Sequence, residues 1–119
     1  MKYLLIIALG FINFNAFSQE TITAAQAKDF IGKEVFLVEK VAGIRLFKNL
    51  TGDLLLLNID KTYPNNEITV SINRETLVKG KFTETELLNK NIKVKGTITI
   101  YKEKPEIKLQ NEADLTIVE

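Results

Sequence analysis

Lysines gather in the stretch NIKVKGTITIYKEKPEIKL, residues 91–109, in which apolar and polar residues alternate. From Lys90 to Lys108 the chain carries six lysines and only two glutamates. Lys93, Lys95 and Lys102 are candidate ligands for an anion, because ammonium groups aligned on a strand can hold successive phosphates. The alternative is that these lysines keep an exposed strand soluble and protect its edge from pairing with other chains. The residue types alone leave both interpretations open.

Two tyrosines are candidate partners for these lysines. Tyr63 lies in the segment KTYPNN, and Tyr101 ends the alternating run. An exposed aromatic ring offers a platform on which a base can stack, which contributes on the order of 1–3 kcal/mol per base. The alternative for each ring is a structural role, in which it covers one end of the fold.

The residue types that are missing narrow the chemistry. The chain has no histidine and no cysteine, so the usual zinc ligand sets, a cysteine nucleophile and the commonest general base are absent. The carboxylates of Asp53, Asp60 and Glu67 could gather near loops, but nothing in their spacing indicates a paired acid site. We therefore expect a protein that is not an enzyme and that carries no cofactor and no metal.

The first 18 residues resemble a secretion leader. Lys2 precedes an apolar run, and the small residues Ala16 and Ser18 suit cleavage before Gln19. The alternative, a retained membrane anchor, is disfavoured because Asn13 interrupts the apolar run well short of the roughly 20 residues that span a bilayer. We expect a signal peptide at 1–18 and one exported domain at 19–119, periplasmic or secreted, with no stable membrane span.

The first half of the expected domain begins with a helix and continues with two strands. Thr23 and Gln26 have the spacing of a capping box, which predicts a short helix at 24–31. Residues 34–49 are rich in β-formers and predict one long strand, bent at Gly43 because a glycine inside a strand marks a bulge or bend. A turn at 51–53 and a short strand at 54–60, buried on both faces, follow.

The second half alternates strands with short helical segments. A loop at 61–66 leads to a strand at 67–73, and helical fragments follow at 74–80 and 83–90, the second with a capping box at Thr83 and Glu86. Residues 91–101 form a further strand, Pro105 marks a hairpin, and 107–109 and 115–118 close the chain. The period of two places one set of residues inward: Ile92, Val94, Gly96, Ile98 and Ile100.

This order of elements predicts the fold. Five strands, the first long and bent, with a short helix before the first strand and another between the third and fourth, match an all-β Greek-key barrel called the OB fold. An open sandwich is the alternative, but it normally has about seven strands.

Three segments carry a resemblance to a family: ITAAQAKDFIGK at 22–33, NIDKTYPN at 58–65 and GTITIYKEKPEI at 96–107. They are similar to the small exported bacterial OB-fold domains, which are grouped with nucleic-acid-binding folds. The resemblance implies a ligand-binding role for Asn58 and Tyr63 in one loop and for Tyr101 and Lys102 on a hairpin. The chain departs from the family pattern at four positions, where it has an acidic residue: Glu39, Asp60, Glu103 and Glu106.

These observations lead to one functional expectation and two alternatives. The expectation is a non-catalytic OB-fold binding module for single-stranded nucleic acid or a similar oligomer. One alternative is a module that holds a protein partner in the cell envelope through an exposed strand edge. The other is an oligosaccharide-binding module, which would depend on the loop tyrosine more than on the lysines.

Overall fold

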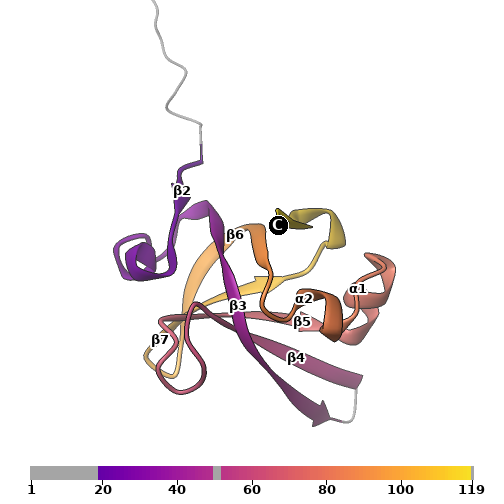
Figure 1. The fold of residues 1–119 in the computed structure, drawn as a ribbon. Helices are drawn as coiled ribbons and strands as arrows, with labels where there is room; N and C mark the ends of the chain where they lie inside the picture. The colour runs from indigo at the N-terminus through magenta and orange to yellow at the C-terminus, as the bar shows by residue number, and fades with distance from the viewer. Residues whose placement is uncertain (1–18, 50–51, 119) are drawn as a thin grey trace, which may run out of the picture.

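The computed structural model describes residues 19–49 and 52–118 (Figure 1). The expected signal peptide and part of the expected turn at 51–53 lie outside these residues. The strands are β2 (Thr21–Ile22), β3 (Glu34–Asn49), β4 (Gly52–Ile59), β5 (Ile68–Asn73), β6 (Asn91–Tyr101), β7 (Lys104–Leu109) and β8 (Leu115–Ile117). The helices are the 3-10 helices η2 (Ala24–Asp29) and η3 (Glu112–Asp114) and the α-helices α1 (Arg74–Lys79) and α2 (Glu84–Leu87).

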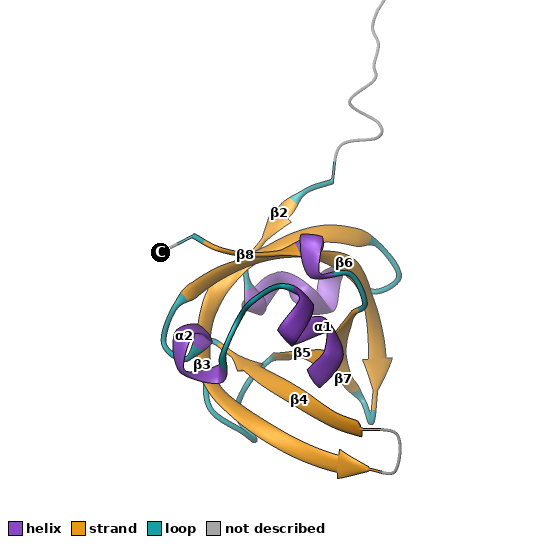
Figure 2. Cartoon of the chain, turned by 90° about the vertical axis from the view of Figure 1, so that its right-hand side faces the viewer, coloured by secondary structure: helices purple, strands orange, loops and turns teal. Residues whose placement is uncertain are grey.

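The strands pair in the order β2-β3-β4-β5-β7-β6-β8, and β3 also pairs with β6. The five longer strands therefore form a closed circuit, β3-β4-β5-β7-β6 and back to β3. The β5–β7 pairing is parallel and the other pairings of the circuit are antiparallel. In Figure 2 these strands curve around the molecule, and α1 lies in the middle of the view.

The expected number of strands was wrong, because the described residues contain seven rather than five. The two additional strands are β2 and β8, of two and three residues. β2 pairs only with β3, and β8 pairs only with β6. Such short segments show no usable period, and they become strands only because an edge of a neighbouring strand is free to pair. The closed circuit also excludes the open sandwich.

The bend in β3 allows one strand to serve two sides of the circuit. Its first half pairs with β6, from Glu34 to Lys40, and its second half pairs with β4. The register with β4 shifts between Val41 and Gly43, so the bulge expected at the glycine is confirmed. Because of this bend, the second half of β3 joins β4, β5 and β7 in one continuous surface.

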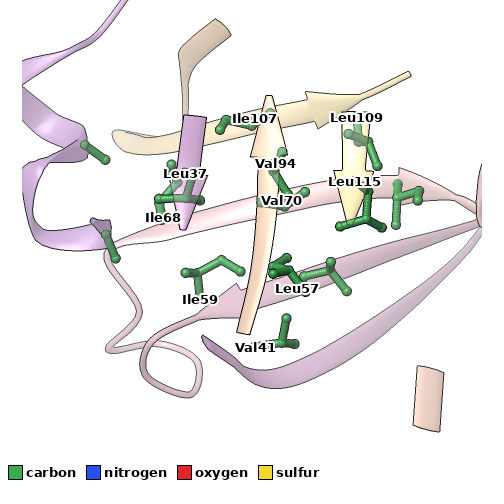
Figure 3. Close-up of a cluster of buried hydrophobic side chains, with 14 of the residues drawn as sticks. Leu37, Val41, Leu57, Ile59, Ile68, Val70, Val94, Ile107, Leu109 and Leu115 are labelled. Carbon is green, nitrogen blue, oxygen red and sulfur yellow. The ribbon is translucent and has the colours of Figure 1, made fainter. Parts of the chain in front are cut away.

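One apolar cluster fills the interior. Its buried members come from the whole described chain, from Ile22 near the start to Leu115 near the end. Figure 3 shows side chains from β3, β4, β5, β6, β7 and β8 meeting there. In β4 the odd-numbered residues Leu55, Leu57 and Ile59 are fully buried in this core. The even-numbered side chains of β4 face the other way, yet Leu56 and Asn58 are also buried. The expectation that this strand is covered on both faces is confirmed.

The inward set predicted for β6 is correct for Ile92, Val94 and Ile98, which are fully buried. Ile100 is a correction, because its side chain is 51% exposed. It pairs with Pro105 near the tip of the β6–β7 hairpin, and this tip extends past the end of the core.

Pro105 does not form the hairpin turn, which is a second correction. The turn consists of Lys102 and Glu103, whose φ angles are 50° and 69°, and Pro105 lies within β7. It is tolerated there because the pairing of β7 with β5 begins one residue later, at Glu106, so no ladder bond to β5 requires its missing N–H.

The N-terminal helix is shorter than expected and of a different type. η2 ends at Asp29, and its backbone bonds span three residues, as from the Phe30 N–H to the Ala27 carbonyl. The Gln26 side chain accepts a hydrogen bond from the Thr23 N–H at 2.9 Å, as the capping-box spacing predicts. The chain then turns at Gly32, where φ is 85°, and this turn into β3 prevents a longer helix.

Both helices expected between β5 and β6 are present, and α2 begins at the residue that its capping box predicts. Asn73 Oδ1 accepts from the Thr76 N–H at 2.8 Å at the start of α1. At α2 the Thr83 hydroxyl accepts from the Glu86 N–H, and the Glu86 carboxylate accepts from the Thr83 N–H, both at 3.1 Å. Across the described residues, no helix is both long and apolar enough to cross a membrane.

A surface ion pair ties these two helices together and leads to a pH prediction. Arg74 donates to both carboxylate oxygens of Glu84 at 3.1 Å. This hydrogen bonding lowers the pKa of Glu84. A lowered pKa in the folded state means that the pair stabilises the fold above the unfolded pKa, and that this contribution is lost as the pH falls through the folded value. Because both side chains are partly exposed, the effect is small.

We therefore expect Glu84→Gln to lower the unfolding midpoint in urea at pH 7, and the difference from the parent to shrink as the pH falls below the ordinary pKa of a glutamate and to vanish below its lowered folded pKa. The control is Glu103→Gln, in the exposed β6–β7 turn, which should leave the midpoint unchanged at both pH values. A difference for Glu84→Gln that persists at low pH would show that the ion pair is not its cause.

Candidate functional site

A groove crosses the outer surface of β3, β4, β5 and β7, and its volume is about 590 Å³. Its walls come from these strands, from the loop between β4 and β5, and from the β6–β7 hairpin. The residues that line it are Arg45, Phe47, Leu54, Leu56, Tyr63, Pro64, Thr69, Ser71, Asn73, Tyr101, Lys102, Lys104, Pro105, Glu106, Lys108, Leu109 and Gln110.

The strand register arranges this surface in rows. In one row Arg45 lies opposite Leu56, Leu56 opposite Ser71, and Ser71 opposite Lys108. A neighbouring row contains Phe47, Leu54 and Asn73 in the same way. The groove thus has an apolar strip along β4 between cationic and polar side chains.

The next row is polar and lies under the loop that joins β4 to β5. Asn58 pairs with Thr69, and Thr69 pairs with Glu106. Asn58 and Glu106 are 2% and 8% exposed. The side chain of Asn66, from the loop itself, donates to the hydroxyl of Thr69 at 2.9 Å. The loop therefore converts one row of the outer face into buried polar groups.

Tyr63 holds a cation at the wall of the groove. The guanidinium carbon of Arg45 lies 3.8 Å from the centre of the Tyr63 ring, and 5.8 Å from that of Phe47. The Lys104 ammonium donates to the carbonyl of Pro64 at 2.7 Å, 5.9 Å from the same tyrosine ring. A cation over an aromatic face is stabilised by the ring quadrupole, so these contacts fix both charges beside the loop.

The β6–β7 turn supplies the other wall. Tyr101 is 55% exposed, and the Lys102 ammonium lies 5.5 Å from the centre of its ring. The left-handed backbone at Lys102 and Glu103 forms the tight turn that places the side chains of Tyr101 and Lys102 at the end of the groove.

Charge on the groove is positive although the whole chain is nearly neutral. Arg45, Lys102, Lys104 and Lys108 line it against a single acid, Glu106. Four cations and one carboxylate give a net charge of +3, compared with +1 for the full chain. A concave surface lined mainly by one sign of charge concentrates ligands of the opposite sign.

The structure brings some of the predicted site residues together and separates others. Tyr63, Tyr101 and Lys102 line the groove. Asn58 lies beneath the loop and does not line it, and its Oδ1 atom has no hydrogen-bond donor among the described residues.

Lys93 and Lys95 lie on the first part of β6, opposite Val38 and Phe36 of β3. The Lys93 ammonium lies 4.4 Å from the centre of the Phe36 ring. Neither lysine lines the groove, so the lysine-bearing stretch divides between two surfaces. A binding role for Lys93, Lys95 and Asn58 stays a prediction.

Arg45, Phe47 and Glu106 were not predicted as site residues. Arg45 and Phe47 occupy alternate positions after the bulge at Gly43, so strand parity counted from that glycine points them to one face. Strand parity also places Glu106 with Lys108 on the face opposite to Ile107, but the burial of Glu106 has no signal in the local sequence. No group of three acidic residues that could hold a metal occurs within residues 19–49 and 52–118.

Comparisons with known proteins bear on the fold. No family model matches the chain, and no curated protein matches it. Solved structures do match. A chain in the crystal structure of yeast Stn1 and Ten1 has a TM-score of 0.62 and 10% identity over 87% of this chain. A protein described as an aspartyl-tRNA synthetase, from Leishmania major Friedlin, has a TM-score of 0.52 and 13% identity over 86% of this chain.

This chain spans 64% and 21% of the lengths of those two structures. At such identities the likeness concerns the fold alone. The strand order and both likenesses support an OB-like fold, mostly β-sheet with a few short helices. The class that these findings define is therefore one of fold, that of OB-like domains.

Proposed function

We propose that this protein is an exported, non-catalytic OB-fold module that binds single-stranded nucleic acid in the groove. The observation that carries the proposal is the composition of the groove, in which four cations and three aromatic rings surround an apolar strip. Export is supported by the leader-like pattern of residues 1–18, and a non-catalytic role by the absence of histidine and cysteine from the sequence.

Single-stranded nucleic acid matches this composition in two ways. Its phosphates are anionic, and neutralising each of them releases counterions, which favours binding at low salt. Its unpaired bases expose flat apolar faces that stack on aromatic rings and pack on apolar side chains. At the hairpin, one aromatic ring and two cations lie within a few residues and offer both interactions: Tyr101, Lys102 and Lys104.

The two alternatives are distinguished by the charge of the groove. A neutral oligosaccharide has no net charge, so the four cations of the groove do not attract it over a distance. A protein partner that added a strand to the β2 or β8 edge would leave the groove unused. The groove composition therefore favours a ligand that is both anionic and aromatic.

The test is a titration of residues 19–119, labelled with nitrogen-15, with a short deoxythymidine oligomer at low salt. We expect backbone amide signals of Arg45, Ser71 and Lys108 to shift, and those of Lys93 and Thr116, on the β6–β8 side, to stay in place. Shifts confined to the β6–β8 side would contradict the proposed site. An unchanged spectrum, with a partner captured from envelope extracts, would favour the protein-binding alternative.

Tyr101 provides a direct test of stacking. We expect Tyr101→Ala to weaken binding of a deoxythymidine oligomer by at least about 5-fold, since one stacked base contributes about 1 kcal/mol or more. Tyr101→Phe keeps the ring and should bind like the parent. Equal affinities for the alanine and phenylalanine variants, measured by fluorescence anisotropy, would exclude this ring as a platform.

A further inference from the structure

The groove is lined by one acidic side chain whose buried oxygen has no hydrogen-bond donor among the described residues. Glu106 lines the groove and is 8% exposed, and its Oε1 atom is buried without a hydrogen-bond donor from the described residues. The Oδ1 atoms of Asn58 and Asn66 are likewise buried without a donor from the described residues, but neither residue lines the groove. Buried acceptors are normally paired, and one left without a donor is destabilising, more so when it is charged.

These three acceptors belong to one place in the fold. Thr69 pairs with Asn58 on one side and with Glu106 on the other. Asn66 reaches the same residue from the loop, because its amide group donates to the Thr69 hydroxyl. Asn58 and Asn66 thus place two buried acceptors beneath the loop, beside the residue that pairs with Glu106.

Nearby cations do not neutralise Glu106. The ion pairs formed within residues 19–49 and 52–118 all involve Arg74, the first residue of α1. Arg45 stacks on Tyr63 instead, and Lys104 donates to the Pro64 carbonyl. The contacts that hold these two cations at the groove wall therefore leave the Glu106 carboxylate without an ion-pair partner among the described residues.

The charge around the floor restricts what that group can be. A free cation would meet the net positive charge of Arg45, Lys104 and Lys108 before it reached the carboxylate. A neutral N–H donor on an otherwise anionic ligand meets no such barrier. The edge of a nucleobase is such a donor, because the phosphates of the same strand are attracted by the surrounding cations.

The four bases differ in how well they match a carboxylate. Guanine presents two adjacent donors, the N1–H and the N2 amino group, which can bind both oxygens of one carboxylate. Adenine and cytosine present one amino group beside a ring nitrogen that is itself an acceptor. Thymine and uracil present one N–H between two carbonyls, which the carboxylate repels. Paired donors and acceptors in such a geometry are the usual means of telling bases apart.

We propose that Glu106 is a specificity-determining residue that selects guanine at one position of the bound strand. This inference rests on the proposed function, since it names the base that the same groove prefers. It assigns a role to the acidic residue at position 106, where the family pattern has a neutral one.

The test compares deoxythymidine oligomers that carry one central substitution, with anisotropy as the measure of affinity. We expect the oligomer with one deoxyguanosine to bind at least about 5-fold more tightly than the oligomer without it. Deoxyinosine, which lacks the N2 amino group, should bind with intermediate affinity. Deoxyadenosine and deoxycytidine should give smaller gains than deoxyguanosine. This series uses the parent protein and does not depend on any variant folding.

A pair of variants then locates the effect. Glu106→Gln keeps one acceptor and removes the charge, so the preference for deoxyguanosine should fall to about 2-fold or less, with the deoxythymidine affinity kept or raised. Glu103→Gln makes the same change of charge on the turn outside the groove, and should keep the full preference.

Two results would overturn the inference while leaving the proposed function standing. One is equal affinity of the parent protein for all the substituted oligomers. The other is a guanine preference that survives in Glu106→Gln. If no oligomer binds at low salt, the proposed function and the inference fail together.

Discussion

Replacing Lys102 and Lys108 by glutamine in one variant should weaken binding of a deoxythymidine oligomer by roughly 60-fold at about 50 mM salt. Both lysines line the groove. If each neutralises one phosphate of a single strand, each contributes about 0.7 to the slope of log K against log salt. Removing both lysines therefore lowers the slope by about 1.4. If the parent and the variant bind equally at about 1 M salt, this difference in slope gives the expected weakening at about 50 mM.

The matched control is the double variant of Lys93 and Lys95, which removes the same charge from the other part of β6. We expect its slope to remain close to that of the parent and its affinity to fall only slightly. Equal losses of affinity in both variants would show that general charge, rather than the groove, attracts the oligomer. A larger loss in the control would place the binding surface on the β3–β6 side.

The second large effect is on stability and concerns Gly96. A Cβ atom built at this position would lie 2.5 Å from the Cγ2 methyl of Ile107, which is fully buried. Ile107 is β-branched and stiff at χ1, so the methyl cannot easily move aside. Overpacking of a dense core costs about 1–3 kcal/mol, and we expect Gly96→Val to lower the free energy of unfolding by about 3 kcal/mol. Denaturation of residues 19–119 by urea measures it.

The position of Gly96 explains why the clash is costly. β6 pairs with β3 up to Thr97 and with β7 from Ile98 onward, so the glycine lies where the strand changes partners and the circuit closes. The control is Thr97→Val, at the exposed neighbouring residue, whose free energy of unfolding should change by less than about 0.5 kcal/mol. If Gly96→Val is as stable as this control, the close approach of β6 and β7 is wrong.

Local sequence patterns account for most of the elements. Three of these patterns act through neighbouring backbone groups: the period of two in β6, the glycine in β3 and the capping box at Thr83. The elements that they indicate could therefore be predicted without knowledge of the fold. The strands β2 and β8 could not, because their existence depends on a free edge that only the folded chain supplies. Ile100 was misplaced for a similar reason, since the period does not say where the core ends.

The candidate site was only partly predictable, because strand pairing decides which lysines are neighbours. Lys95 and Lys102 have similar surroundings in the sequence, yet β6 changes partners between them. Arg45 became part of the site through its contact with Tyr63, across a loop and a strand. Glu106 lies beside Thr69 only because β5 and β7, which are far apart in the chain, pair with each other. Each of these features is a long-range contact, and local patterns carry no information about it.

The most direct test of the central claim is the affinity of residues 19–119 for a labelled single-stranded DNA oligomer, measured by fluorescence anisotropy at rising salt. With four cations in the groove, we expect binding at low salt and a slope of log K against log salt of roughly −2 to −3. No binding at low salt, or binding that does not change with salt, would contradict the claim that the groove holds the phosphates of a single strand.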